Sequence, residues 1–132
     1  MGTRSVRRTV SARDDGYNSP LCLYTNVTYA TPNLQTTAGK IVYVGVLPAN
    51  CCPLETVVRI NTTFNGLLIV GTTSNTSALA STADVAAGTA NTYVVDRYYG
   101  TRTTVDVPVY VQLTTASTVG EADIWVNYLP AR

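Results

Sequence analysis

The stretch TVDVPVYVQL, residues 104–113, decides the fold of this chain. Apolar side chains occupy every second position, and polar residues, a tyrosine and a proline stand between them. Strict alternation with a period of two is typical of a β-strand that turns one face to a core and the other away from it. Pro108 lacks an amide hydrogen, so we expect either an edge strand or a bulge there. The predicted inward row comprises Val105, Val107, Val109, Val111 and Leu113.

The same alternation recurs in EADIWVNY, residues 121–128, which we predict to be the last strand. Five further strands are predicted at 21–29, 41–47, 56–61, 67–70 and 93–99. The strand at 41–47 is apolar on both faces, which favours a central position in a sheet. Asn65-Gly66 predicts a hairpin turn between 56–61 and 67–70. Pro48 and Pro53 flank Asn50-Cys51-Cys52, which indicates a loop over residues 48–53.

Residues 71–88 are mostly small, and we expect them to form a long connection that crosses from one sheet to the other. About seven strands and no long helix favour an all-β fold, an antiparallel two-sheet sandwich, over a barrel. A jelly-roll-like connectivity is preferred, although an immunoglobulin-like strand order remains open. The sandwich is expected to span residues 20–132, and residues 1–19 to form an extended basic N-terminal arm outside it.

The charge distribution supports this division. Charged residues make up 13% of the chain, against about 25% in ordinary soluble domains. Four of the nine basic residues, however, fall within the first thirteen positions. The arm is either a disordered polar terminus or a segment that orders against an acidic or carbonyl-rich neighbour. Under the second interpretation its partner-binding residues are Arg4, Arg7, Arg8 and Arg13.

Several function classes are disfavoured by the composition. The net charge of +1 implies no general attraction to nucleic acid or to an anionic membrane. The one basic and aromatic cluster, Arg97-Tyr98-Tyr99 with Arg102, holds only two arginines. No secretory signal or membrane-spanning apolar run is apparent, so we expect a soluble protein that is made in a cytoplasm.

The sequence also lacks the groups that carry most enzyme chemistry. It contains no histidine, which removes histidine triads and histidine metal sites. Cys22, Cys51 and Cys52 are expected to be reduced, small and buried, although a pairing of Cys22 with Cys51 or Cys52 stays open, and they make a poor zinc site. Asp106 and Asp123 could approach each other across paired strands, although a catalytic carboxylate pair is disfavoured. We therefore expect no enzyme activity, no cofactor and no metal.

Aromatic residues on the outward faces suggest binding to other proteins. Most of the nine tyrosines fit half-buried surfaces, since tyrosine joins a large ring to a polar tip. Tyr110 and Trp125, however, fall on the faces that alternation assigns away from the core. Aromatic residues at such positions are typical of protein interfaces. We therefore predict that both residues bind partners, and that the poorly charged chain associates with itself.

Three segments resemble the small β-sandwich structural proteins of tailed-bacteriophage virions. They are VGTTSN at 70–75, ALASTADV at 78–85 and GEADIWVNYLP at 120–130. The resemblance as a whole covers roughly residues 40–130 and leaves out the arm. It implies a capsid decoration (cement) protein that forms a trimer on the virion surface and binds the major capsid protein. Two alternatives stay open: a neck, tail or host-attachment fibre component, and a carbohydrate-binding module with exposed tryptophan and tyrosine.

Overall fold

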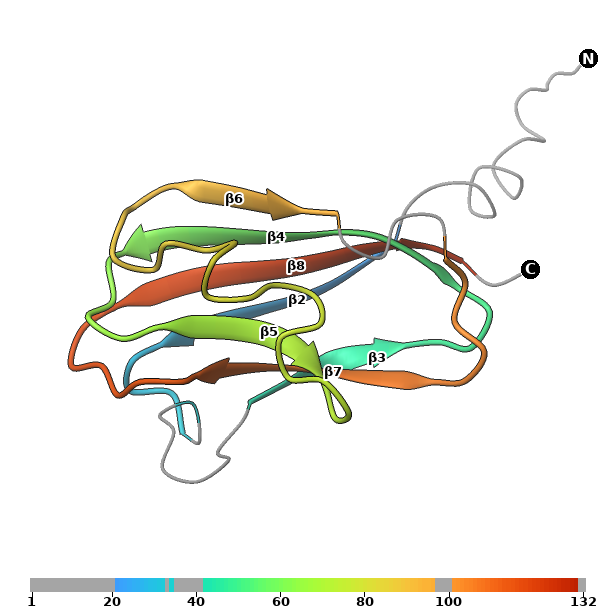
Figure 1. The fold of residues 1–132 in the computed structure, drawn as a ribbon, viewed down its shortest axis with the longest axis horizontal. Coiled ribbons are helices and arrows are strands. Elements are labelled where there is room, and N and C mark those ends of the chain that lie inside the picture. Colours follow the sequence, from blue (N-terminus) through green and yellow to red (C-terminus); the bar gives the residue numbers. More distant parts are fainter. Residues whose placement is uncertain (1–20, 33, 35–41, 97–100, 131–132) are drawn as a thin grey trace, which may run out of the picture.

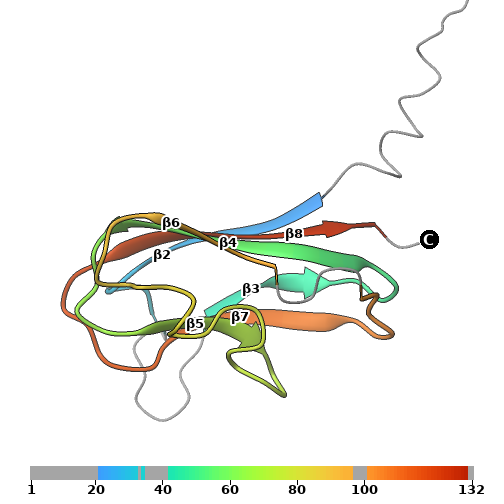
Figure 2. The same cartoon turned by 45° about the horizontal axis from the view of Figure 1, so that its top comes forward.

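The computed structural model describes residues 21–32, 34, 42–96 and 101–130. Within these ranges the regular elements are β-strands, and they form two antiparallel sheets that face each other as the layers of a sandwich (Figures 1 and 2). The strands are β2 (Leu21–Thr28), β3 (Val42–Leu47), β4 (Cys52–Thr62), β5 (Leu68–Thr72), β6 (Thr92–Val95), β7 (Val107–Leu113) and β8 (Glu121–Leu129). The predicted seven-stranded antiparallel sandwich is confirmed.

Each strand lies in the opposite sheet from the strand before it. The four-stranded sheet has the order β2-β8-β4-β6, and the three-stranded sheet has the order β3-β7-β5. Every connection between described strands therefore crosses from one layer to the other, as in a jelly roll. An eighth strand is reduced to an isolated bridge, in which Ala80 pairs with Val70 beside β5. The predicted crossing connection after β5 is confirmed, and it contributes buried Leu79, Val85 and Ala87 to the core.

The core lies between β7 and β5 on one side and β4 and β8 on the other. Ala122, Ile124, Val126 and Tyr128 of β8 are buried and alternate with half-buried positions, as predicted. On β7 the inward row is likewise confirmed, although it begins later than expected. Val105 precedes the strand and is 63% exposed. The fully buried members of that row are Val109, Val111 and Leu113.

Pro108 lies at a position that is locally an edge. Successive residues of a strand direct their amides to opposite neighbours, and the Leu113 amide donates to Leu34 whereas the Thr114 amide donates to Leu67, just before β5. The nitrogen of Pro108, an even-numbered position like 114, therefore points to the β5 side. Because β5 ends opposite Val109, no ladder hydrogen bond is lost at the proline, even though β7 is the central strand of its sheet.

The predicted hairpin at Asn65-Gly66 is wrong, because β4 and β5 belong to different sheets. Asn65 instead anchors the crossing loop to residues 117–118: its Oδ1 accepts from Ser117 Oγ at 2.6 Å and from the Thr118 amide at 2.9 Å. An added Cβ at Gly66 would lie 2.2 Å from the Thr115 carbonyl oxygen. The glycine therefore permits close backbone approach, and neither residue has a positive φ.

Two further predictions are corrected. The strand at 41–47 was expected to be central, but β3 pairs only with β7 and forms the edge of its sheet. The loop at 48–53 is shorter than predicted, since β4 begins at Cys52 and accommodates Pro53 with a register shift before Glu55. Ile41 and residues 97–99 of the predicted strands lie outside the described residues.

We expect Val109→Asp to lower the free energy of unfolding by at least about 3 kcal/mol, because it buries an unpaired charge in the inward row of β7. Gln112→Ala on the outer face of the same strand should change it by no more than about 0.5 kcal/mol. Urea denaturation of both variants measures the difference, and equal midpoints would contradict the face assignment.

Gly66→Ala should cost about 1–3 kcal/mol, because its Cβ would meet backbone that cannot move aside without displacing residues 115–116. Gly88→Ala is the matched control, since the nearest atom to its Cβ is the Phe64 carbonyl oxygen at 3.8 Å. Thermal unfolding of the two variants tests the comparison. A harmless Gly66→Ala would mean that the crossing loop does not pack as described.

Candidate interaction surfaces

The two predicted aromatic residues lie on opposite outer faces of the sandwich. Trp125 is on β8 of the four-stranded sheet, and Tyr110 is on β7 of the three-stranded sheet. Each contacts a tyrosine directly opposite on the neighbouring strand. The ring centroids of Trp125 and Tyr24 are 5.3 Å apart, and those of Tyr110 and Tyr43 are 5.8 Å apart. Sequence reasoning missed both partners, because only the strand register places them there.

The outer face of the four-stranded sheet, here called the β8 face, carries the rings of Tyr24 and Trp125 together with polar side chains. The carboxylate of Asp123 lies at its centre and accepts three hydrogen bonds. Tyr24 Oη donates to Oδ1 at 2.6 Å and Asn26 Nδ2 to the same atom at 2.9 Å, while Asn61 Nδ2 donates to Oδ2 at 2.8 Å. The residues of the face include Tyr24, Asn26, Glu55, Val57, Arg59, Asn61, Val94, Glu121, Asp123, Trp125 and Asn127.

This network shifts the pKa values of two of its members. The hydrogen bond from Tyr24 holds the pKa of Asp123 below its ordinary value, and Asn26, Asn61 and the charge of Arg59 act in the same direction against partial burial. The same bond raises the pKa of Tyr24, with further contributions from burial and from the charges of Asp123 and Glu121. Both shifts favour a carboxylate bonded to a neutral phenol.

The outer face of the three-stranded sheet, here called the β7 face, has a different character. It presents Tyr43, Pro108, Tyr110 and Gln112. None of the residues in β3, β5 and β7 is charged. Tyr43 leaves 55% of its surface exposed at the sheet edge. The sandwich therefore has one outer face without charge and one with three carboxylates and a guanidinium group.

The predicted chemical groups do not assemble into a reactive site. Asp106 precedes β7 and accepts a hydrogen bond from the Ala49 amide at 2.9 Å, so it does not pair with Asp123 on the other sheet. Arg102 donates to the carbonyl oxygen of Asn50 at 2.6 Å and thereby braces a turn. Among the described residues, no group of three or more histidine, cysteine or acidic side chains could hold a metal ion.

The three cysteines are free, and one of them is misplaced by the sequence prediction. Cys51 and Cys52 are buried as expected, but Cys22 is exposed on β2. Burial raises the pKa of the Cys51 thiol, although a hydrogen bond from Thr103 partly offsets this effect. Cys51 is therefore an unreactive packing residue at the end of the sandwich. No helix in the described part of the chain has the length and apolar character that a membrane span requires.

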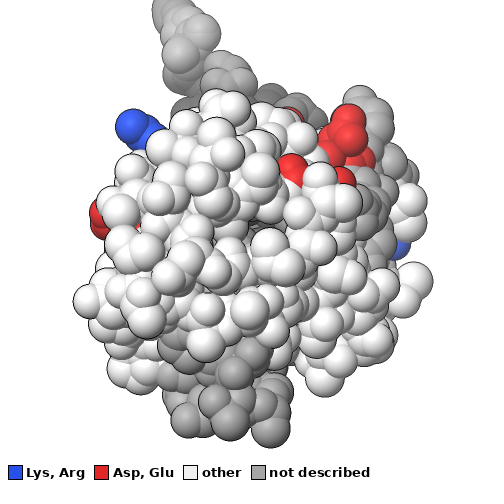
Figure 3. Space-filling view, turned by 60° about the vertical axis from the view of Figure 1, so that its left-hand side comes forward, with Lys and Arg blue, Asp and Glu red and all other residues white. Residues whose placement is uncertain are grey.

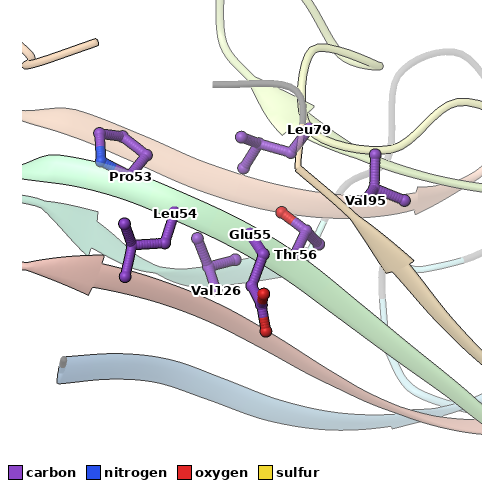
Figure 4. Close-up of a pocket in the computed structure, with 7 residues that line it drawn as sticks. All are labelled: Pro53, Leu54, Glu55, Thr56, Leu79, Val95 and Val126. Carbon is purple, nitrogen blue, oxygen red and sulfur yellow. The ribbon is translucent and has the colours of Figure 1, made fainter. Parts of the chain in front are cut away.

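Two hollows among the described residues also lack a catalytic set of groups. A gap between the sheets is lined by β4, Leu79, Val95 and Val126 (Figure 4), and it leaves no space for a water molecule. A second hollow of about 220 Å³ opens at one end of the sandwich, where threonines and Arg102 of residues 101–105 meet Leu47, Pro53 and Val107. Neither hollow joins a nucleophile to a general base.

The described residues therefore define a jelly-roll β-sandwich with an aromatic pair on each outer face. Arg4, Arg7, Arg8 and Arg13 lie outside the described residues. No family model matches this chain, and no curated protein matches it.

Two solved structures contain chains with the same fold. A chain of the structure described as the cyanophage Pam1 capsid asymmetric unit superposes with a TM-score of 0.65 and 21% identity, over 86% of each chain. A chain of the capsid of Ralstonia phage GP4 superposes with a TM-score of 0.54 and 16% identity, over 83% of this chain and 85% of that one. At these identities the likeness shows a shared fold.

We expect the stability of the protein to fall as the pH drops below about 4, and Asp123→Asn to weaken that dependence. A carboxylate whose pKa is lower in the folded chain than its unfolded value of about 3.9 stabilises the fold above that value. The contribution is lost as the pH falls through the folded pKa. Tyr24→Phe removes the largest cause of the shift and should also flatten the profile. Thermal unfolding from pH 7 to pH 2 tests both variants; profiles parallel to the wild type would contradict the assignment.

Proposed function

We propose that this chain is a structural protein of a bacteriophage virion: a decoration or cement protein that binds between major capsid protein subunits and stabilises the head. The observation that carries the proposal is the pair of aromatic contacts on opposite outer faces. The fold is shared with chains from two phage capsid structures, which supports the choice of assembly. The proposed location is the capsid surface, after synthesis in the host cytoplasm.

A cement protein has to hold two neighbours at once, and the two faces suit that task. One flat interface cannot cover both Tyr110 and Trp125, because the whole sandwich lies between them. Tryptophan and tyrosine are the side chains that most often dominate binding energy at interfaces. The uncharged β7 face can be buried without desolvating an ion. The β8 face, with three carboxylates against one guanidinium, suits a basic neighbour.

Self-association is the second part of the proposal. The edge strands β2, β3 and β6 leave backbone groups without a strand partner among the described residues, and such edges favour pairing with other chains. Val94 on β6 is 61% exposed and Tyr24 on β2 is 50% exposed. Charged side chains cover little of the surface in Figure 3. These features favour a closed homo-oligomer; three subunits are preferred because of the resemblance described above.

The proposal is tested with heads purified from a deletion mutant of the phage that encodes this chain. Added wild-type protein should bind over the whole capsid surface and raise the temperature at which the heads release their DNA. The variant pairs Tyr43→Ala with Tyr110→Ala, and Tyr24→Ala with Trp125→Ala, should each weaken binding by about thirtyfold or more. Gln112→Ala on the β7 face is the matched control.

Each alternative predicts a different result in the same experiment. Binding of a few copies at one vertex would indicate a neck or tail component. No binding to heads, together with binding of glycans that Trp125→Ala abolishes, would indicate a carbohydrate-binding module. Either result would reject the cement function.

A further inference from the structure

We infer that the β8 face is the docking site for the arginine-bearing N-terminal arm of a neighbouring copy of this chain. The inference deepens the self-association part of the proposed function and rests on that part alone. Under this inference the neighbour on the β8 face is a second copy of the chain, and the β7 face is the one left for the capsid. The docking of the arm does not require a capsid, so it can fail while capsid binding through the β7 face stands, and capsid binding can fail while the docking stands.

The first observation is a separation of charge along the chain. The β8 face holds three carboxylates, those of Glu55, Glu121 and Asp123, against one guanidinium group, that of Arg59. Residues 1–13, in contrast, hold four arginines and no acidic residue. Opposite charges on two parts of one chain favour contact between them, and this is the charge complementarity expected of a docking pair.

The second observation is the arrangement of acceptors on the β8 face. Glu121 and Glu55 each accept one side-chain hydrogen bond through Oε2, from Asn26 at 3.1 Å and from Asn127 at 3.2 Å. No described hydrogen bond uses the other oxygen of either group. A guanidinium can bind such a carboxylate through two parallel N–H donors. The rings of Tyr24 and Trp125 lie between the two carboxylates in the strand register, and arginine also stacks on such rings.

The spacing of the charges agrees with an extended segment lying along the sheet. Glu55 of β4 pairs with Asn127 of β8, which lies six residues along β8 from Glu121. The two carboxylates are therefore about 20 Å apart along the strand direction at the usual strand rise. Arg7 and Arg13 are six residues apart in the sequence, so in an extended chain they would lie on the same side and about 20 Å apart. Both ends of such a segment could therefore meet a carboxylate at once.

The length of the arm indicates that a neighbouring copy supplies it. Strand β2 begins at Leu21, beside Tyr128 and at the opposite end of the sheet from Glu121. Consider an arm that docks on its own chain, with a turn of two to four residues just before Leu21 and an extended segment running antiparallel to β2. Arg13 would then lie beside the part of β2 from Tyr24 to Asn26. Arg4, Arg7 and Arg8 would then pass beyond Thr28, where β2 ends. Only one arginine would meet its own face, whereas an arm from a second copy can place several there.

The test uses charge reversal in the full-length chain. The arm variant combines Arg4→Glu, Arg7→Glu, Arg8→Glu and Arg13→Glu, and the face variant combines Glu55→Lys with Glu121→Lys. Asp123 is left unchanged because three side chains bond to it. The control adds the same positive charge to exposed positions between β5 and β6: Thr73→Lys, Thr82→Lys, Ala83→Lys and Ala86→Lys.

Sedimentation equilibrium at low salt should show an oligomer for the wild type and the control. The arm variant and the face variant should each dissociate, with Kd raised about tenfold or more for each. An equal mixture of the two variants should associate again, because the acidic arm of one then meets the basic face of the other. Raising the salt concentration should weaken the wild-type oligomer. Should a reversed variant fail to fold in a thermal scan, the Arg→Gln and Glu→Gln versions replace it.

Three results would overturn the inference. They are a monomeric wild type, variants that retain the wild-type oligomer, and a mixture that stays dissociated. The last result would mean that the arm acts on its own chain or on a different surface.

Discussion

The burial of the inward rows of β7 and β8 in one shared core is the constraint on which the rest of the structure depends. Both are central strands, one in each sheet, and every second residue of each points into the core. A shift of one residue in either strand would turn the whole row to solvent, so burial fixes the register. The outward residues are fixed at the same time. Tyr110 and Trp125 face outward and are half-buried because the buried positions of the same strands are Val109, Val111, Ile124 and Val126.

The strict alternation in these two strands is also what made the fold predictable. A period of two is a local property of the sequence, and it identified the strands, their inward faces and the sandwich class. The wrong predictions concern sequence features whose cause is a contact with a distant part of the chain. The Asn65-Gly66 pair has the composition of a hairpin turn, yet its glycine is required by the backbone of residues 115–116. Strand β3 is apolar on both faces although it is an edge, and Leu23 of β2 packs directly over Gly45.

The candidate site was predictable to the same extent as the fold: the features set by local alternation were predicted, and those set by strand pairing were not. Alternation placed Tyr110 and Trp125 outside the core, but it gave no information on their neighbours. Tyr24 and Asn26 meet Trp125 and Asp123 through the pairing of β2 with β8, across about a hundred residues of sequence. A register of that kind depends on the whole sheet. The exposure of Cys22 was missed for a related reason, since its segment shows no regular alternation from which a face could be assigned.

The chemical difference between the two outer faces restricts how copies of this chain can associate. The β8 face and an arginine-bearing arm are complementary to each other, and neither is complementary to itself. Two β8 faces brought together about a twofold axis would oppose carboxylates to carboxylates, which is unfavourable. A contact between a face and an arm is therefore heterologous, and heterologous contacts form closed rings when the rotation between subunits closes. The β7 face carries no charge that would oppose a like charge, so it remains available to a different neighbour on the other side of each subunit.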